Sequence, residues 1–234
     1  MGSAISHALA AGGADVAISY AHSRSDAETM SNELRALGAK SSVHRADVRH
    51  VQECDGLVQA VIEQHGRLDI LVGCAGTTRH IAFPDLANVT EDVWDDIFDV
   101  NLKGAFFVSR AAGIRMREHG DGHSVIVNIT STAAFGTTGS SIPYSVSKGA
   151  LVQATRLLAV ALAPSVRVNS VAPGLVLTRW WTQLGDEVVQ QRIASTRFQR
   201  PVELDDVVQT AMVAITNESI SGQTLVVDPA NIMP

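Results

Sequence analysis

Short apolar segments alternate with amphipathic segments of helix length along nearly the whole chain, with glycine, proline, asparagine and aspartate at the joints. The apolar segments predict strands at Asp15–Ser19, Ser42–Ala46, Ile70–Cys74, Ser124–Thr130, Arg167–Val171 and Thr224–Val227. The amphipathic segments predict helices at about Ser3–Ala11, Ser25–Leu37, Val51–His65, Glu91–Glu118, Pro143–Leu162 and Glu203–Thr216. This alternation predicts an α/β fold with a doubly wound, mostly parallel sheet, covered by helices on both faces.

The composition fits one domain, residues 1–234, built around such a sheet. Apolar residues make up 46% of the chain and aromatic residues only 5%, so the core must consist mainly of alanine, valine, leucine and isoleucine. These are the residues of a buried parallel sheet with helices packed on it. No internal repeat or linker divides the chain.

Charge and cysteine content exclude several classes of partner. Lysine and arginine number 18 against 24 acidic residues, with no basic run, so nucleic acid is not expected as a partner. No apolar run approaches the roughly 20 residues that span a bilayer, so no membrane is expected either. Cys54 and Cys74 lack a metal-like spacing and indicate a reduced, cytoplasmic protein. His119 and His123 flank Asp121 in a glycine-rich turn, and we interpret them as solvated, with no metal site.

Tyr144 and Lys148 are four residues apart near the start of a predicted helix, so their side chains project from one face about one turn apart. An ammonium group beside a tyrosine stabilises the phenolate and lowers the tyrosine pKa, which predicts that Lys148 tunes Tyr144 for acid–base catalysis. Pro143 suits the first helical turn and places Tyr144 at the carboxyl edge of the sheet, where ligands bind. Taken alone, the Tyr-x-x-x-Lys pattern favours a structural tyrosine followed by a solvated lysine over a catalytic pair.

Ser131 follows the strand Ser124–Thr130 directly, so it lies on the same edge as Tyr144. A loop with Gly136 and Gly139 returns the chain to that tyrosine. A hydroxyl group in this position could hold a substrate oxygen beside Tyr144. The three residues together indicate a carbonyl/alcohol oxidoreductase.

In order and spacing these motifs resemble the short-chain dehydrogenase/reductase family, and the resemblance covers almost every residue from Gly2 to Asp228. The family has its catalytic serine thirteen residues before its tyrosine, as Ser131 stands before Tyr144. Its Tyr-x-x-x-Lys motif is Tyr144-Ser-Val-Ser-Lys148, and its catalytic asparagine matches Asn101. Its Pro-Gly loop with a following threonine matches Pro173, Gly174 and Thr178. The chain is similar within the family to 3-oxoacyl-acyl-carrier-protein reductases.

The resemblance implies a Rossmann-like fold and a role for each matched residue. Tyr144 would act as general acid/base, Ser131 would orient the carbonyl group, and Lys148 would hold the nicotinamide ribose. Asn101 would support a proton-relay water. The alternative for Asn101 is a side chain that bends its helix by competing for backbone hydrogen bonds.

The cofactor motifs match the family only in part. Asp47 and Val48 end a strand and resemble the adenine contact, and Ala75 and Gly76 keep the close backbone approach that a dinucleotide needs. Gly73 and Cys74 replace the two asparagines that usually brace the central strands, so we expect a less rigid sheet there.

Family members that prefer NAD carry an acidic residue at the end of the second strand, and Tyr20 stands at that position here. Without a carboxylate, Arg24, His22 and Ser23 could receive a 2′-phosphate, so NADP(H) is predicted in preference to NAD(H). A solvated loop that leads to Ser25 as helix N-cap fits the same residues.

The first residues, Met1 to Ile5 with Gly2, align with the end of the family's glycine-rich turn, so the usual first strand and most of that turn have no counterpart. In this fold the strand is central, and without it two strand edges and the pyrophosphate site lose their backbone partners. We expect that translation begins upstream or that this is a truncated form.

Two further segments suggest substrate contacts and assembly. Trp180 and Trp181, in the family's mobile substrate loop, fit an apolar wall for substrate, a cap on the core or a subunit contact. The helix after Lys148 is apolar on more than one face and predicts a homodimer or homotetramer. The sequence has no concentrated basic patch, so it does not indicate an acidic carrier protein as partner.

The sequence therefore predicts an NADP(H)-dependent oxidoreductase acting on a small carbonyl or alcohol substrate, such as a ketone or a 3-oxoacyl thioester. The alternative is a non-catalytic remnant or interaction protein that keeps the fold but binds dinucleotide poorly.

Overall fold

The computed structural model describes residues 1–119, 122–178 and 185–229. All strand pairs in this part of the chain are parallel, and they form two hydrogen-bonded groups. The first group is β1 (Val16–Tyr20) beside β2 (Ser41–Arg45), and the second has the order β3-β4-β5-β6. The bounds of the second group are β3 (Ile70–Gly73), β4 (Ser124–Ile129), β5 (Val166–Pro173) and β6 (Thr224–Val227). The expected parallel α/β architecture is confirmed.

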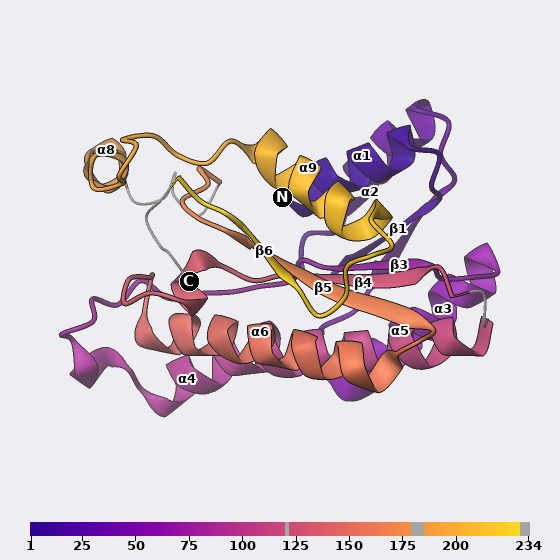
Figure 1. Ribbon diagram of the computed structural model, residues 1–234, viewed down its shortest axis with the longest axis horizontal. Coiled ribbons are helices and arrows are strands. Elements are labelled where there is room, and N and C mark those ends of the chain that lie inside the picture. Colours follow the sequence, from indigo (N-terminus) through magenta and orange to yellow (C-terminus); the bar gives the residue numbers. More distant parts are fainter. Residues whose placement is uncertain (120–121, 179–184, 230–234) are drawn as a thin grey trace.

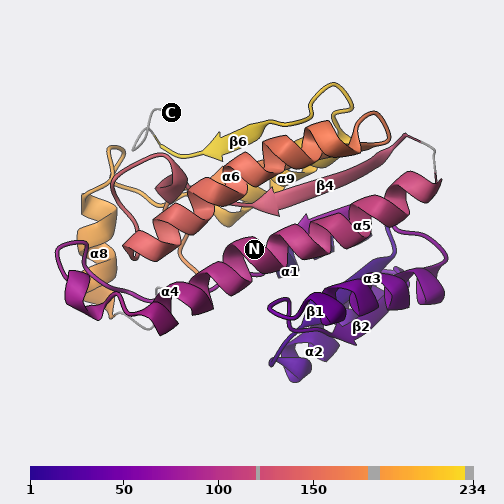
Figure 2. The ribbon, with the colours of Figure 1, turned by 90° about the horizontal axis from the view of Figure 1, so that it is seen from below.

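Helices cover both faces of these strands (Figure 1). One face carries α1 (Gly2–Ala11) and α9 (Leu204–Thr216), with α2 (Arg24–Ala36) beside β1 and β2. The opposite face carries α3 (Val51–His65), α5 (Ala105–His119) and α6 (Ile142–Leu162), which Figure 2 shows from their outer side. The strands β4 and β5 supply residues to the apolar clusters on both faces, which is why they read as continuous apolar runs.

The long predicted helix Glu91–Glu118 is wrong in one respect, because it is interrupted. The structure has α4 (Glu91–Phe98), then a π-helical segment (Asp99–Gly104), then α5. A π-helical turn inside an α-helix shifts the side chains that follow it, and such turns are frequent at functional sites. The other predicted strand and helix bounds lie within two residues of the observed ones, and α3 and β6 match in full.

One helix was not predicted. The segment α8 (Asp186–Ala194) lies at the carboxyl edge of the sheet, where sequence reasoning placed a mobile loop. Its low amphipathicity and mixed polar composition give little helical signal.

Between β1 and β3, no ladder joins the two strand groups in the described ranges. This agrees with the expectation that the edges of two strands lack a neighbour. The two groups are linked through helices instead, since Leu9 of α1 packs against both the β1–β2 cluster and the β3–β6 cluster.

The space left at Gly73 is filled by a side chain of the neighbouring strand. A Cβ atom at this glycine would come within 2.5 Å of the Asn128 side-chain oxygen, so the glycine leaves room for that amide. Asn128 is fully buried in β4 and donates to the Thr155 hydroxyl of α6 at 3.2 Å. The Asn128 side chain therefore occupies the space beside Gly73 and ties β4 to α6.

Within the described ranges, no helix combines the length and the apolar character needed to cross a membrane.

Candidate active site

The start of α6 presents Tyr144 to the carboxyl edge of the sheet. Ser141 caps the helix, because its hydroxyl accepts a hydrogen bond from the Tyr144 backbone N–H at 3.4 Å. Pro143 stands in the first turn, where its missing N–H leaves no acceptor unsatisfied. The sequence thus begins the helix at a defined residue and fixes the direction of the tyrosine side chain.

Ser131 follows β4 and lies close enough to the Tyr144 hydroxyl to affect its pKa. The Ser131 hydroxyl also accepts from the Ala133 backbone N–H at 3.2 Å, which fixes its rotamer. Burial raises the pKa of Tyr144 above its ordinary value, and the Ser131 hydroxyl opposes this rise. Tyr144 is therefore protonated at neutral pH and is ready to donate a proton.

Lys148 is fully buried one turn after Tyr144, and its ammonium group lies 5.8 Å from the centre of the Tyr144 ring. Burial lowers the pKa of Lys148 to about 8. The ammonium donates to the Ile129 carbonyl at 2.9 Å. The net lowering of the Tyr144 pKa that was expected from Lys148 is not found, because burial raises this pKa and outweighs a lysine charge that lies 5.8 Å from the ring centre and donates to the backbone of β4.

Asn101 lies in the π-helical segment and is fully buried. Its side-chain oxygen accepts from the Thr77 N–H at 2.8 Å, and its side-chain nitrogen donates to the Thr77 carbonyl at 3.0 Å. The same nitrogen donates to the Ser147 hydroxyl at 3.1 Å. The amide thus holds the loop after β3 against α6 rather than bonding to its own helix, contrary to the alternative in which it bends that helix.

Ser147 is a residue that sequence reasoning missed. Its buried hydroxyl donates to the Tyr144 carbonyl at 2.7 Å and accepts from Asn101, so a chain of hydrogen bonds connects Asn101 with the backbone of Tyr144. Its place between Tyr144 and Lys148, on an inward helix position, was the available signal. Ser147 is a positioning residue.

The cofactor residues predicted after β2 are held by tight local contacts. Arg49 donates to both carboxylate oxygens of Asp47, and its hydrogen bonds hold the Asp47 pKa at about 2. Val48 packs against Gly104, where a Cβ atom would come within 2.8 Å of the Val48 carbonyl oxygen. The end of the π-helical segment therefore fixes the backbone of Val48.

At the ends of β1 and β2, Tyr20 lies opposite Arg45. Arg24 begins α2 and donates to Glu28 at 2.7 Å, while Arg45 lies 3.7 Å from Glu53. Arg45 is a second residue that sequence reasoning missed, since only the strand register brings it beside Tyr20. The cap position predicted in the alternative is wrong, because Ser23 and not Ser25 is the N-cap, but the segment is exposed to solvent as that alternative expects.

The remaining predicted cofactor residues divide into two groups along the same edge. Gly2 begins α1, and a Cβ atom there would lie 3.4 Å from the Cys74 sulfur, just before Ala75 and Gly76. Pro173 ends β5 opposite Val227, and Gly174 donates to the Val227 carbonyl at 2.9 Å. Thr178 follows at the end of a described range. Trp180 and Trp181, as well as Asp121, lie outside the described residues.

These groups supply a proton donor, a fixed hydroxyl partner and a buried cation at one edge of a parallel sheet. The Lys148 ammonium has three donors, and its hydrogen bond among the described residues goes to the Ile129 carbonyl, so donors remain for the vicinal hydroxyl groups of a ribose. The geometry suits proton transfer to a carbonyl oxygen.

Comparisons with known proteins agree with this arrangement. A family model described as enoyl-(acyl carrier protein) reductase matches residues 1–229. The protein is an NAD(P)-dependent oxidoreductase with a Rossmann-type fold. It belongs to the short-chain dehydrogenase/reductase family, and the comparisons favour an enzyme over a non-catalytic remnant.

Several relatives are ketoreductases. A ketoacyl reductase of the granaticin polyketide synthase of Streptomyces violaceoruber is 38% identical over 97% of this chain and 90% of its own. A 3-oxoacyl-acyl-carrier-protein reductase of Synechocystis is 31% identical over 100% and 93%. The crystal structure of an actinorhodin polyketide ketoreductase variant with NADPH has a TM-score of 0.87 and 29% identity, covering 97% of this chain and 91% of that one.

Proposed function

We propose that this protein reduces the carbonyl group of a ketone or a 3-oxoacyl substrate at the expense of NADPH. The observation that carries the proposal is that Ser131, at the end of β4, and Tyr144, at the start of α6, lie together at the carboxyl edge of the sheet, one helical turn from the buried Lys148. A protonated hydroxyl donates to a carbonyl oxygen, so the resting state suits reduction. The relatives named as ketoreductases support the same direction.

In the proposed mechanism, Ser131 donates a hydrogen bond to the substrate carbonyl oxygen and orients it beside Tyr144. Reduced nicotinamide supplies the hydride to the carbonyl carbon. As negative charge develops on the oxygen, Tyr144 transfers its proton there, and the Lys148 ammonium stabilises the phenolate that remains. Asn101 and Ser147 keep the tyrosine and the loop after β3 in place.

The preference for NADPH over NADH rests on the edge formed by β1 and β2. Tyr20 provides no carboxylate to repel a 2′-phosphate, and the guanidinium groups of Arg24 and Arg45 both lie at this edge, with Ser23 as a further donor. Both arginines are exposed and paired with single glutamates, which a phosphate would displace at little cost.

The experiment is a comparison of the two cofactors by absorbance at 340 nm, with S-acetoacetyl-N-acetylcysteamine as substrate. The wild type should have a kcat/KM at least about tenfold higher for NADPH than for NADH, because charge-assisted hydrogen bonds to a phosphate contribute about 1.5 to 3 kcal/mol. The substitutions Arg24→Ala and Arg45→Ala should each reduce that ratio mainly through KM for NADPH. Equal use of both cofactors by the wild type would contradict the preference.

We further propose that residues 1–234 act as one cytoplasmic domain that assembles into a homodimer or homotetramer. The free thiols of Cys54 and Cys74 support a reducing compartment. On α6, Leu157 is 60% exposed and Val160 is 79% exposed, which supports a second apolar face available for a subunit contact.

A further inference from the structure

Two loops are joined beside Tyr144, at the open side of the candidate site. The Thr78 hydroxyl is 2.6 Å from the Ser140 hydroxyl, and the Ile81 N–H donates to the Ser140 carbonyl at 2.9 Å. Ser140 directly precedes the cap of α6, so the loop after β3 is anchored within one helical turn of Tyr144. These contacts make a fixed rim on the substrate side.

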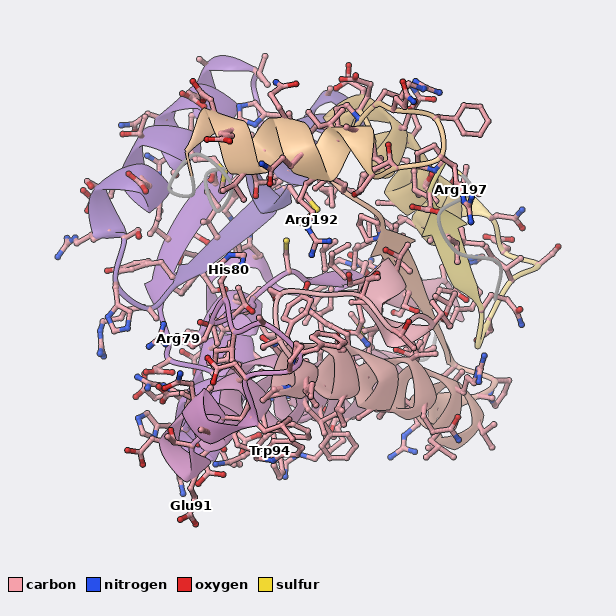
Figure 3. All side chains as sticks on the ribbon, turned by 90° about the vertical axis from the view of Figure 1, so that its left-hand side faces the viewer. Arg79, His80, Glu91, Trp94, Arg192 and Arg197 are labelled. Atoms are coloured by element: carbon pink, nitrogen blue, oxygen red, sulfur yellow. The ribbon has the colours of Figure 1, made fainter. Side chains whose placement is uncertain are left out.

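Arg192 of α8 reaches this rim from the opposite direction. Figure 3 shows its side chain extending from α8 toward the middle of this face, on the side where His80 lies. Its guanidinium group donates to the Gly139 carbonyl at 3.4 Å. Gly139 is tightly packed, because a Cβ atom there would meet the Ser145 hydroxyl oxygen.

His80 and Arg192 are close enough to affect each other electrostatically. Burial lowers the pKa of His80, and the positive charge of Arg192 lowers it further. These two nitrogen-rich side chains come from segments more than 100 residues apart and lie on the same face of the molecule (Figure 3).

The charges around Arg192 are unbalanced. Among the described residues no carboxylate forms an ion pair with its guanidinium group, which donates to the neutral Gly139 carbonyl. Arg79, next to His80 in sequence, lies instead 3.8 Å from Asp96 of α4. Arg192 therefore keeps donors for an anion with no carboxylate beside it among the described residues, whereas Arg79 has Asp96 nearby.

We propose, on the basis of the reductase function above, that Arg192 and His80 bind an anionic group carried by the carbonyl substrate. A guanidinium group presents donors in a fork that matches a carboxylate or a phosphate. An anion bound there would also favour the protonated form of His80, which adds a second cationic donor. The Ser140 hydroxyl lies between this pair and Tyr144, so the carbonyl and the anionic group would occupy neighbouring parts of one substrate.

The test uses two pairs of substrates with the same reacting group and different charge. The first pair is acetoacetyl-coenzyme A, which carries phosphates, and S-acetoacetyl-N-acetylcysteamine, which is neutral. The second pair is acetoacetate, a carboxylate, and its neutral ethyl ester. The variant Arg192→Gln removes the charge, Arg192→Lys retains it, and Arg67→Gln removes an exposed arginine at the other end of β3 as the matched control.

We expect Arg192→Gln to raise KM for one or both anionic substrates about 10- to 100-fold, with neutral substrates changed less than about twofold and kcat retained. Arg192→Lys should restore part of the loss, and Arg67→Gln should change nothing. If Arg192→Gln raises KM for acetoacetyl-coenzyme A alone, the anionic group bound at the site is a phosphate. If it raises KM for acetoacetate alone, that group is a carboxylate. Equal effects on charged and neutral substrates, or no effect, would overturn the proposal.

The outcome is separable from failure of the reductase function. If the wild type reduces none of the four substrates, the proposed function fails, and calorimetric titration of coenzyme A and acetoacetate still tests the anion site. Binding to the wild type that is lost in Arg192→Gln would support the site. Absence of binding to the wild type would overturn it.

Discussion

At the scale of single residues, the site depends on the balance between burial and ionisation. Lys148 is buried and Tyr144 is half-buried, and the loss of contact with water favours the neutral form of each. For the tyrosine this is the form needed for proton donation. For the lysine, the neutral amine is the wrong form, because only the ammonium stabilises a phenolate. Keeping Lys148 charged in the interior therefore lowers the free energy of unfolding.

The variant Lys148→Met should be more stable than the wild type and inactive. The folded-state pKa of about 8 lies below the ordinary 10.5, so the folded protein binds this proton more weakly than the unfolded chain does. Below pH 8 the penalty is complete, at about 3 kcal/mol, and it declines as the pH rises toward 10.5. Urea denaturation at pH 7 should therefore show a gain of about 1 to 3 kcal/mol that shrinks by pH 9.5.

The same ionisation predicts the pH dependence of reduction. Because the ammonium form of Lys148 is required, kcat of the wild type should fall as the pH rises through about 8. A rate that stays constant from pH 7 to pH 10, or a Lys148→Met variant that is less stable at pH 7, would contradict this view of the lysine.

At the scale of elements, Gly73 of β3 and Asn128 of β4 depend on each other for space. Its missing side chain accommodates Asn128, and a Cβ atom would lie 2.5 Å from the amide oxygen. Gly73→Ala should therefore destabilise the fold by about 1 to 3 kcal/mol through overpacking. Gly56→Ala in α3 is the matched control, because no atom outside the helix lies within 4 Å of its Cβ position and alanine is the better helix former.

Thermal unfolding followed by circular dichroism distinguishes these two variants. Gly73→Ala should melt several degrees below the wild type, and Gly56→Ala should melt at or above it. Similar melting temperatures for Gly73→Ala and the wild type would show that Asn128 does not depend on the glycine.

The elements that the sequence predicts well are those with a clear period and clear end signals. The helix Val51–His65 ends at Gly66, whose φ of 85° is a left-handed C-cap, and its bounds were predicted without error. The π-helical turn around Asn101 leaves no periodic signature, because one extra residue in a turn hardly alters the apolar pattern. The role of Asn101 as a clamp on Thr77 depends on a contact 24 residues away, which spacing alone does not reveal.

At the scale of the whole molecule, residues distant in sequence meet only through the topology. The serine, tyrosine and lysine of the site were predicted together because one strand and one helix carry them. Arg45 and Arg192 were missed for the opposite reason, since the β1–β2 register places the first and the packing of α8 places the second. Motif spacing therefore predicts the residues carried by neighbouring elements, whereas residues such as Arg45 and Arg192 are found only from tertiary contacts.

The outer face of α6 makes a prediction about assembly. Leu157 and Val160 are exposed at 60% and 79%, so the double variant Leu157→Asp/Val160→Asp should convert a dimer to monomers in size-exclusion chromatography with light scattering. Leu37→Asp, at an exposed leucine beyond α2, is the control and should leave the mass unchanged. A wild-type monomer, or a dimer that survives the double variant, would contradict the proposed interface.

The central claim is that this molecule transfers a hydride from NADPH to a carbonyl carbon with Tyr144 as proton donor. Mass spectrometry of the alcohol formed from S-acetoacetyl-N-acetylcysteamine, with NADPH doubly deuterated at C4, measures that transfer directly. We predict one deuterium on the carbinol carbon with the wild type, and a rate at least about 100-fold lower with Tyr144→Phe, because general acid catalysis contributes about 10² to 10⁴ in rate. An alcohol without deuterium, no alcohol at all, or an unchanged rate in Tyr144→Phe would contradict the claim.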